Sequence, residues 1–136
     1  MCTASEYRPY LHSYASDRYL VGYRGRRVEM ISTRAAPHLE PGEQIQTGLV
    51  AQTGSLIFTA RVWTIIVTDR AILVVRGGNA LRVRRDVLLG EPTGMYHAIH
   101  LDRTYRVHKQ YYDEVVAADE ALREMQSRDN PAVGDH

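Results

Sequence analysis

The residues most able to bind a charged ligand in this sequence are its arginines, because every basic residue except Lys109 is an arginine. A guanidinium group carries several N–H donors, so a cluster of arginines suggests a site for a phosphate or a carboxylate. We predict an anion-binding set made of Arg82, Arg84, Arg85, Arg106 and His108. The alternative is that these side chains are simply the solvent-exposed residues on the faces of two strands.

A second group of arginines alternates with tyrosines near the N-terminus. The residues that we predict to bind a partner are Tyr7, Tyr10, Tyr14, Arg18, Arg24, Arg26 and Arg27. Both residue types are enriched at the centres of protein interfaces, and together they can also stack on bases and neutralise phosphates. A tyrosine stripe of helical spacing is most often docked on its own core, and this alternative stays open.

No arrangement of residues predicts catalysis, a metal or a cofactor. His97 and His100 are three apart in a predicted strand, so their side chains point to opposite faces and cannot share one metal ion. Gly77-Gly78 lacks the lysine and the strand-to-helix context of a phosphate loop. Cys2 is the only cysteine and lies at the N-terminus. We therefore expect a protein that is not an enzyme.

Length and composition are those of one ordinary globular domain. The chain has 136 residues, of which 44% are hydrophobic and 24% are charged, and its formal net charge is +1. Its longest apolar runs are far shorter than the ~18 residues that a membrane span requires, and the N-terminus does not resemble a signal peptide. We expect a cytoplasmic protein without a transmembrane segment.

Turn-forming residues around positions 35–42 divide the chain. We expect an N-terminal arm at residues 1–36, a domain at residues 37–126 and a flexible tail at residues 127–136. Three- and four-residue spacing predicts a short amphipathic helix near residues 9–21 of the arm. Residues 27–31 are a candidate short strand.

The domain shows the pattern of short strands rich in valine, isoleucine and threonine. The candidate strands are residues 44–52, 56–60, 62–68, 71–76, 80–85, 96–101 and 104–108. Thr68, Asp69 and Arg70 turn the central hairpin, and we expect the Asp69 carboxylate to accept a hydrogen bond from a backbone N–H two residues on. Because both strands of this hairpin are mostly apolar, we expect the hairpin to be largely buried on both faces.

A helix is predicted at residues 111–126, after the last strand. Val115, Ala118 and Leu122 fall on one stripe, acidic residues occupy the first turn, and arginines come late, as the helix dipole favours. The sequence therefore predicts a mainly β protein, with a bent antiparallel sheet or open barrel capped by this C-terminal helix, plus the N-terminal helical arm.

The domain also resembles a known family. The hairpin around Thr68-Asp69-Arg70 resembles the central hairpin of bacterial pleckstrin-homology-like (PH-like) and GRAM-like domains. The segments LEPGEQIQTGLVAQTG, LLGEPTG and RVHKQYYDEVVAADEAL are similar to those of small PH-like proteins common in actinobacteria. The resemblance covers about residues 38–125 and implies a binding module, although a fold alone names no ligand. Phosphoinositide binding is not expected, because the first hairpin loop, near residues 53–61, offers a single arginine.

These observations predict a non-catalytic PH-like binding or adaptor module. Its expected partner is another protein or a second copy of the chain, and the N-terminal arm would supply the specificity. The alternative is binding of nucleic acid or an anionic membrane surface through the arm and the strand that carries Arg82 and Arg85. We also expect a protein that starts at residue 37 to remain folded and to lose its partner.

Overall fold

The computed structural model describes residues 23–54 and 60–129, with side chains from residue 27 onward. The helical elements are α2 (Tyr23–Ala35), η2 (Ala36–His38), η3 (Lys109–Tyr111) and α3 (Tyr112–Asp129). The strands are β1 (Ile45–Thr53), β2 (Arg61–Thr68), β3 (Ala71–Arg76), β4 (Asn79–Arg84), β5 (Tyr96–His100) and β6 (Thr104–His108). They form one antiparallel sheet in the order β4-β3-β2-β1-β6-β5.

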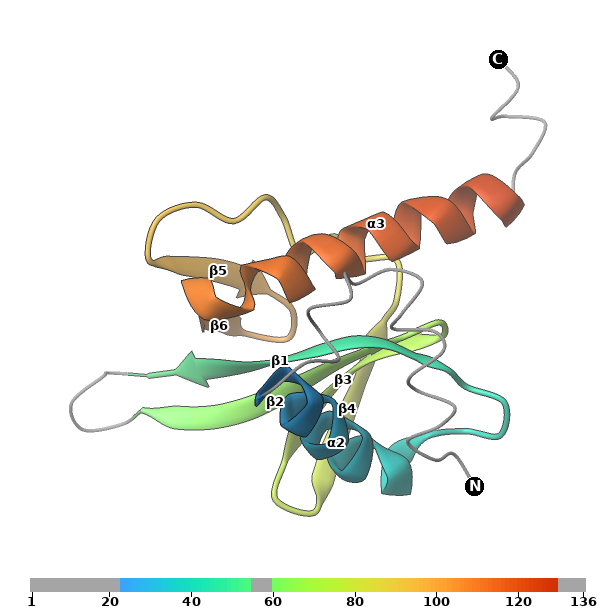
Figure 1. The fold of residues 1–136 in the computed structure, drawn as a ribbon, viewed down its shortest axis with the longest axis horizontal. Coiled ribbons are helices and arrows are strands. Elements are labelled where there is room, and N and C mark those ends of the chain that lie inside the picture. The colour runs from blue at the N-terminus through green and yellow to red at the C-terminus, as the bar shows by residue number, and fades with distance from the viewer. Residues whose placement is uncertain (1–22, 55–59, 130–136) are drawn as a thin grey trace.

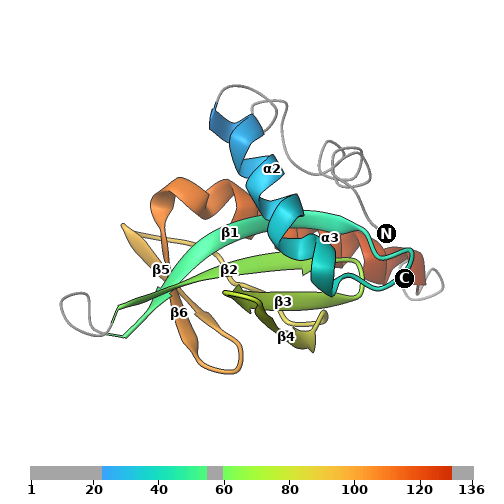
Figure 2. The same cartoon turned by 90° about the horizontal axis from the view of Figure 1, so that it is seen from below.

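The sheet bends at β1 (Figure 2). Strand β2 pairs with β1 from Ile45 to Thr53, whereas β6 meets β1 through a single residue pair, Gln52 with Arg106. The β5–β6 hairpin therefore turns away from the other four strands, and the sheet is bent without closing. Helix α3 runs along one side of it (Figure 1). This confirms the predicted fold class, a bent antiparallel sheet with a C-terminal helix.

The β2–β3 hairpin is buried on both faces, as its composition predicts. Successive strand residues point to opposite faces, so alternate positions enter two different cores. The inner core, which α3 covers, includes Leu49, Ile65, Val67, Ile72, Val74, Tyr105, Val107, Val115 and Ala118. Leu122 is also buried, which confirms the apolar stripe predicted for this helix.

Helix α2 covers the opposite face of the sheet (Figure 2). The outer core that it forms contains Val28, Ile31, Ala35, Ile45, Ile66, Ala71, Leu73 and Val75. The strand predicted at residues 27–31 is therefore wrong, because Val28, Ile31 and Ala35 form a buried helical stripe. This packing also argues against the expectation that a protein starting at residue 37 keeps its stability.

Most of the other predicted elements are confirmed. The observed strands differ from the predicted ones by at most one residue at either end, and α3 extends to Asp129. The helix predicted near residues 9–21 lies outside the described residues, as does all but the last residue of the strand predicted at 56–60.

The central turn uses its polar side chains differently from the prediction. The Thr68 hydroxyl, rather than Asp69, accepts the local hydrogen bonds, which come from the N–H groups of Arg70 and Ala71. The Asp69 carboxylate instead accepts a 2.9 Å hydrogen bond from the Gln44 N–H, and the Asp69 N–H donates to the Gln44 carbonyl at 3.0 Å. Asp69 thus ties the turn to the segment that enters β1.

Candidate binding surface

The structure describes the side chain of one of the seven arm residues predicted to contact a partner. Tyr7, Tyr10, Tyr14 and Arg18 lie outside the described residues. Arg24 and Arg26 lie in α2, but the structure describes only their backbone.

Arg27 is the seventh arm residue, and it is only 7% exposed. Its Nη1 donates to Glu114 Oε1 at 3.1 Å, and its guanidinium carbon lies 4.4 Å from the centre of the Tyr111 ring. The carboxylate and the aromatic face together offset the cost of removing the arginine from water. Arg27 therefore joins α2 to the start of α3 inside the domain, and a partner could reach it only if the two helices separated.

The predicted anion-binding set does not form one site. Arg82 donates to both carboxylate oxygens of Glu43, at 3.2 and 2.9 Å, and to the His38 carbonyl. Arg85 is buried, and it donates to the Gln46 amide oxygen and to the carbonyl groups of Thr68 and Ala118. These two arginines hold distant segments of the chain together.

The remaining three members of the set each have a local contact. Arg84 pairs with Asp86. Arg106 donates to the Gly54 carbonyl. His108 Nδ1 accepts a hydrogen bond from the Gln110 N–H at the start of η3, and its ring contacts Tyr96 edge-on. The set is therefore dispersed over the sheet, and its members do not converge on one position that a single anion could occupy.

Glu43 is the buried carboxylate beneath Arg82. Burial by itself raises the pKa of Glu43, but hydrogen bonds from Arg82, the Glu40 N–H and the Thr68 hydroxyl lower it by more, so the net pKa lies below the ordinary value. Glu43 is therefore ionised at neutral pH and acts as an internal counterion for Arg82.

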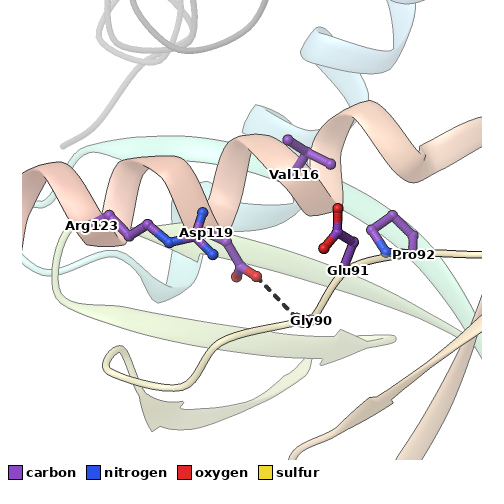
Figure 3. Close-up of a pocket in the computed structure, with 6 residues that line it drawn as sticks. All are labelled: Gly90, Glu91, Pro92, Val116, Asp119 and Arg123. Atoms are coloured by element: carbon purple, nitrogen blue, oxygen red, sulfur yellow. Dashed lines mark hydrogen bonds between the residues drawn. The ribbon is translucent and has the colours of Figure 1, made fainter.

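A small hollow of about 120 Å³ separates α3 from the 88–94 loop (Figure 3). Asp119 points from α3 toward this loop, and its carboxylate accepts hydrogen bonds from the N–H groups of Leu89 at 2.7 Å and Gly90 at 3.0 Å. On the other side of the loop, His97 Nε2 donates to the Leu89 carbonyl at 2.7 Å. Asp119 and His97 thus fasten the loop to α3 and β5, and these two side chains serve the fold.

A larger hollow of about 260 Å³ lies on the inner face of the sheet, where β2 and β4 begin and β3 ends. We call it the Trp63 groove. Its lining residues are Trp63, Val74, Arg76, Asn79, Ala80 and Leu81. Val74 is buried at its base, whereas Leu81 is 45% exposed and presents apolar surface to solvent.

Trp63 is held in one orientation by its neighbours. Its indole N–H donates to the Thr53 hydroxyl at 2.8 Å, and its ring meets Tyr105 edge-on at 5.8 Å. Burial and a hydrogen bond to Asp102 raise the pKa of Tyr105, so this supporting ring stays neutral. An aromatic ring fixed in this way can bind a ligand with little loss of side-chain entropy.

Two guanidinium groups flank the Trp63 ring. The guanidinium carbon of Arg103 lies 5.0 Å from the ring centre and that of Arg76 lies 5.6 Å away, both within the range of cation–π attraction. Arg103 also pairs with Asp102, at 3.2 Å. Among the described residues, no acidic side chain forms an ion pair with Arg76. Of the two guanidinium groups beside Trp63, that of Arg76 is therefore the one that an acidic ligand could bind more readily.

Sequence reasoning missed this groove, although part of the signal was present. The two-residue turn between β2 and β3 sets the register, which runs from Val67 opposite Ile72 to Thr64 opposite Val75. Continuing this register by one residue brings Trp63 opposite Arg76, so their side chains share a face. The approach of Arg103 depends on the bend of the sheet and had no local signal.

Within the described residues, no helix combines the length and the apolar character that a bilayer span requires. Comparison of the chain with protein-family models, curated proteins and solved structures gives no match.

Proposed function

We propose that this protein is a non-catalytic binding module of the PH-like kind that acts through contact with another protein. The supporting fold is a bent antiparallel sheet with a C-terminal helix, which is consistent with the family resemblance of residues 38–125. Binding takes place in the Trp63 groove. This location differs from the arm and from the predicted anion set, whose described side chains have internal partners.

The observation that carries the proposal is the combination of an oriented tryptophan, an exposed leucine and a cation without an acidic partner. Trp63 and Leu81 supply apolar area of the kind that dominates the energy of protein interfaces. Arg76 lies beside them and can form a charge-assisted hydrogen bond with a carboxylate. The groove thus suits an apolar side chain that has an acidic neighbour.

The chain contains a single tryptophan, so fluorescence of Trp63 reports directly on the groove. We would select binders from a random peptide library with the full-length protein and titrate them against it. We expect acidic, apolar peptides that alter Trp63 emission. Arg76→Glu and Leu81→Asp should weaken them about tenfold or more, which corresponds to roughly 1.4 kcal/mol.

The matched control is Arg123→Glu, which reverses one exposed arginine on α3, away from the groove. Selected peptides that bind wild type and all three variants equally would overturn the proposal. A single-stranded oligonucleotide serves as the competing probe. If it alters Trp63 emission in an Arg76-dependent way and no selected peptide does, the groove binds nucleic acid instead of protein.

A further inference from the structure

Strand β4 is the outermost strand on its side of the sheet formed by the described residues. An outer strand presents unpaired N–H and C=O groups, which can pair with a strand from another chain. Which residues present them follows from the hairpin that joins β4 to β3.

The β3–β4 hairpin has a two-residue turn at Gly77-Gly78, and the φ of +63° at Gly77 suits the first central position of a type II′ turn. Arg76 and Asn79 close this turn as a hydrogen-bonded pair, and such pairs recur at every second position. The register of β2 with β3 gives the same alternation of backbone hydrogen bonds along β3. The backbone groups of Ala80, Arg82 and Arg84 therefore point away from β3, toward the open edge.

The charged side chains of β4 do not prevent another strand from pairing with this edge. Arginines on an outer strand commonly discourage pairing with other chains. Here, however, Arg82 is held by Glu43 and the His38 carbonyl, and Arg84 is paired with Asp86. On the groove side, β4 presents Leu81 and Val83, which lie opposite Val74 and Ile72 of β3. A strand added to β4 would thus continue an apolar surface that leads into the Trp63 groove.

The charge around the groove selects the kind of strand. Arg76 lies beside the start of β4, and Arg61 is the direct cross-strand neighbour of Thr53, whose hydroxyl accepts from Trp63. Arg61 therefore shares the face of Trp63 and adds to the positive charge of Arg76 and Arg103. The carboxylate beside Arg103, that of Asp102, is already bonded to Arg103 and Tyr105.

We propose that an acidic, extended segment of a partner protein binds by adding to β4 as a further strand. Its backbone pairs with Ala80, Arg82 and Arg84. Its alternate side chains lie over Leu81 and the Trp63 groove and place a carboxylate against Arg76. This proposal rests on the proposed function and adds the binding mode and the class of partner.

Amide hydrogen exchange, measured by NMR on the full-length protein with a peptide selected as above, tests the binding mode. We expect the peptide to slow exchange of the Ala80, Arg82 and Arg84 amides about tenfold or more. The Leu81 and Val83 amides already pair with β3 and should change less. Two N-methylated peptides, one modified at its odd-numbered residues and one at its even-numbered residues, should differ. One should bind about tenfold more weakly and the other almost normally, because only one set of peptide amides faces β4.

Arg84→Pro provides a variant of the protein itself. The Arg84 N–H faces the open edge, so proline removes an edge donor without removing a bond to β3. We expect weaker peptide binding for Arg84→Pro than for the matched control Arg84→Ala. If a peptide alters Trp63 emission in an Arg76-dependent way and leaves the exchange of the three amides unchanged, strand addition is wrong and the proposed function stands. If no peptide depends on the groove, both proposals fail.

Discussion

Glu43 illustrates how a single buried charge supports this fold. Its carboxylate accepts hydrogen bonds from Arg82, the Glu40 N–H and the Thr68 hydroxyl, and the pKa of Glu43 is lower in the folded protein than its ordinary value of 4.5. These donors come from three separate segments. The ionised carboxylate therefore holds β4 and the central turn to the segment that precedes β1.

The lowered pKa of Glu43 predicts a loss of stability in acid. Above the ordinary pKa of 4.5 the carboxylate is ionised in both states and its stabilisation is fully present. As the pH falls through that value and toward the lower folded-state pKa, the unfolded state binds the proton first, so the free energy of unfolding decreases. We expect Glu43→Gln to be less stable than wild type at neutral pH, with the difference shrinking in acid.

Urea denaturation of both proteins across this pH range measures the effect. Glu40→Gln is the control. Glu40 is 56% exposed and lies 3.7 Å from Arg82, so solvent screens this ion pair and it contributes little to the free energy of unfolding. A constant difference between the Glu43→Gln and wild-type curves would contradict the interpretation.

At the scale of elements, the contact between α2 and β1 depends on the absence of a side chain. A Cβ at Gly48 would lie 2.6 Å from Ile31 Cγ2 and 2.8 Å from Ile31 Cδ1. Ile31 is β-branched and fully buried, so it has few alternative rotamers. Gly48 therefore sets how closely the helix packs on the sheet.

We expect Gly48→Ala to lower the free energy of unfolding by about 1–3 kcal/mol, the usual cost of overpacking a core. The same change made in an Ile31→Ala background should cost less, because the clashing atoms are gone. Gly78→Ala is the control, since a Cβ there meets nothing within 4 Å. Equal costs of Gly48→Ala in the two backgrounds, measured by denaturation, would show that Ile31 is not the constraint.

For the whole molecule, the decisive feature is that a helix covers each face of the bent sheet (Figures 1 and 2). Helix α3 closes the inner core, and α2 closes the outer core over Ile66 and Leu73. Arg27 and Glu114 connect the two helices. Residues 23–35 are thus part of the folded domain.

Removal of residues 1–36 should therefore expose the outer core, lower the cooperativity of unfolding and increase the binding of a hydrophobic dye. In the full-length protein, Ile31→Asp should act in the same direction by several kcal/mol, because it buries an unpaired carboxylate. Thr33→Asp is the control on the exposed side of α2. A truncated protein as stable as the full chain would show that the domain starts at residue 37, as the sequence predicts, and that α2 is not part of it.

The sequence by itself determined the elements whose signals are local. The strands followed from runs of β-branched residues between turns, and α3 followed from the stripe of Val115, Ala118 and Leu122. The burial of both faces of the central hairpin was also predictable, because neither strand has a polar face. These signals span only a few residues, so they need no knowledge of distant partners.

Only the tertiary structure decided which residues meet across the chain. The helix α2 was missed because its stripe of Val28, Ile31 and Ala35 acquires meaning only against the second face of the sheet. The roles of Arg82 and Arg85 depend on Glu43 and on the Ala118 carbonyl, which are 39 and 33 residues away in sequence. An arginine in a sequence shows a charge, whereas its availability to a ligand depends on whether folding brings a carboxylate or a carbonyl within hydrogen-bonding distance.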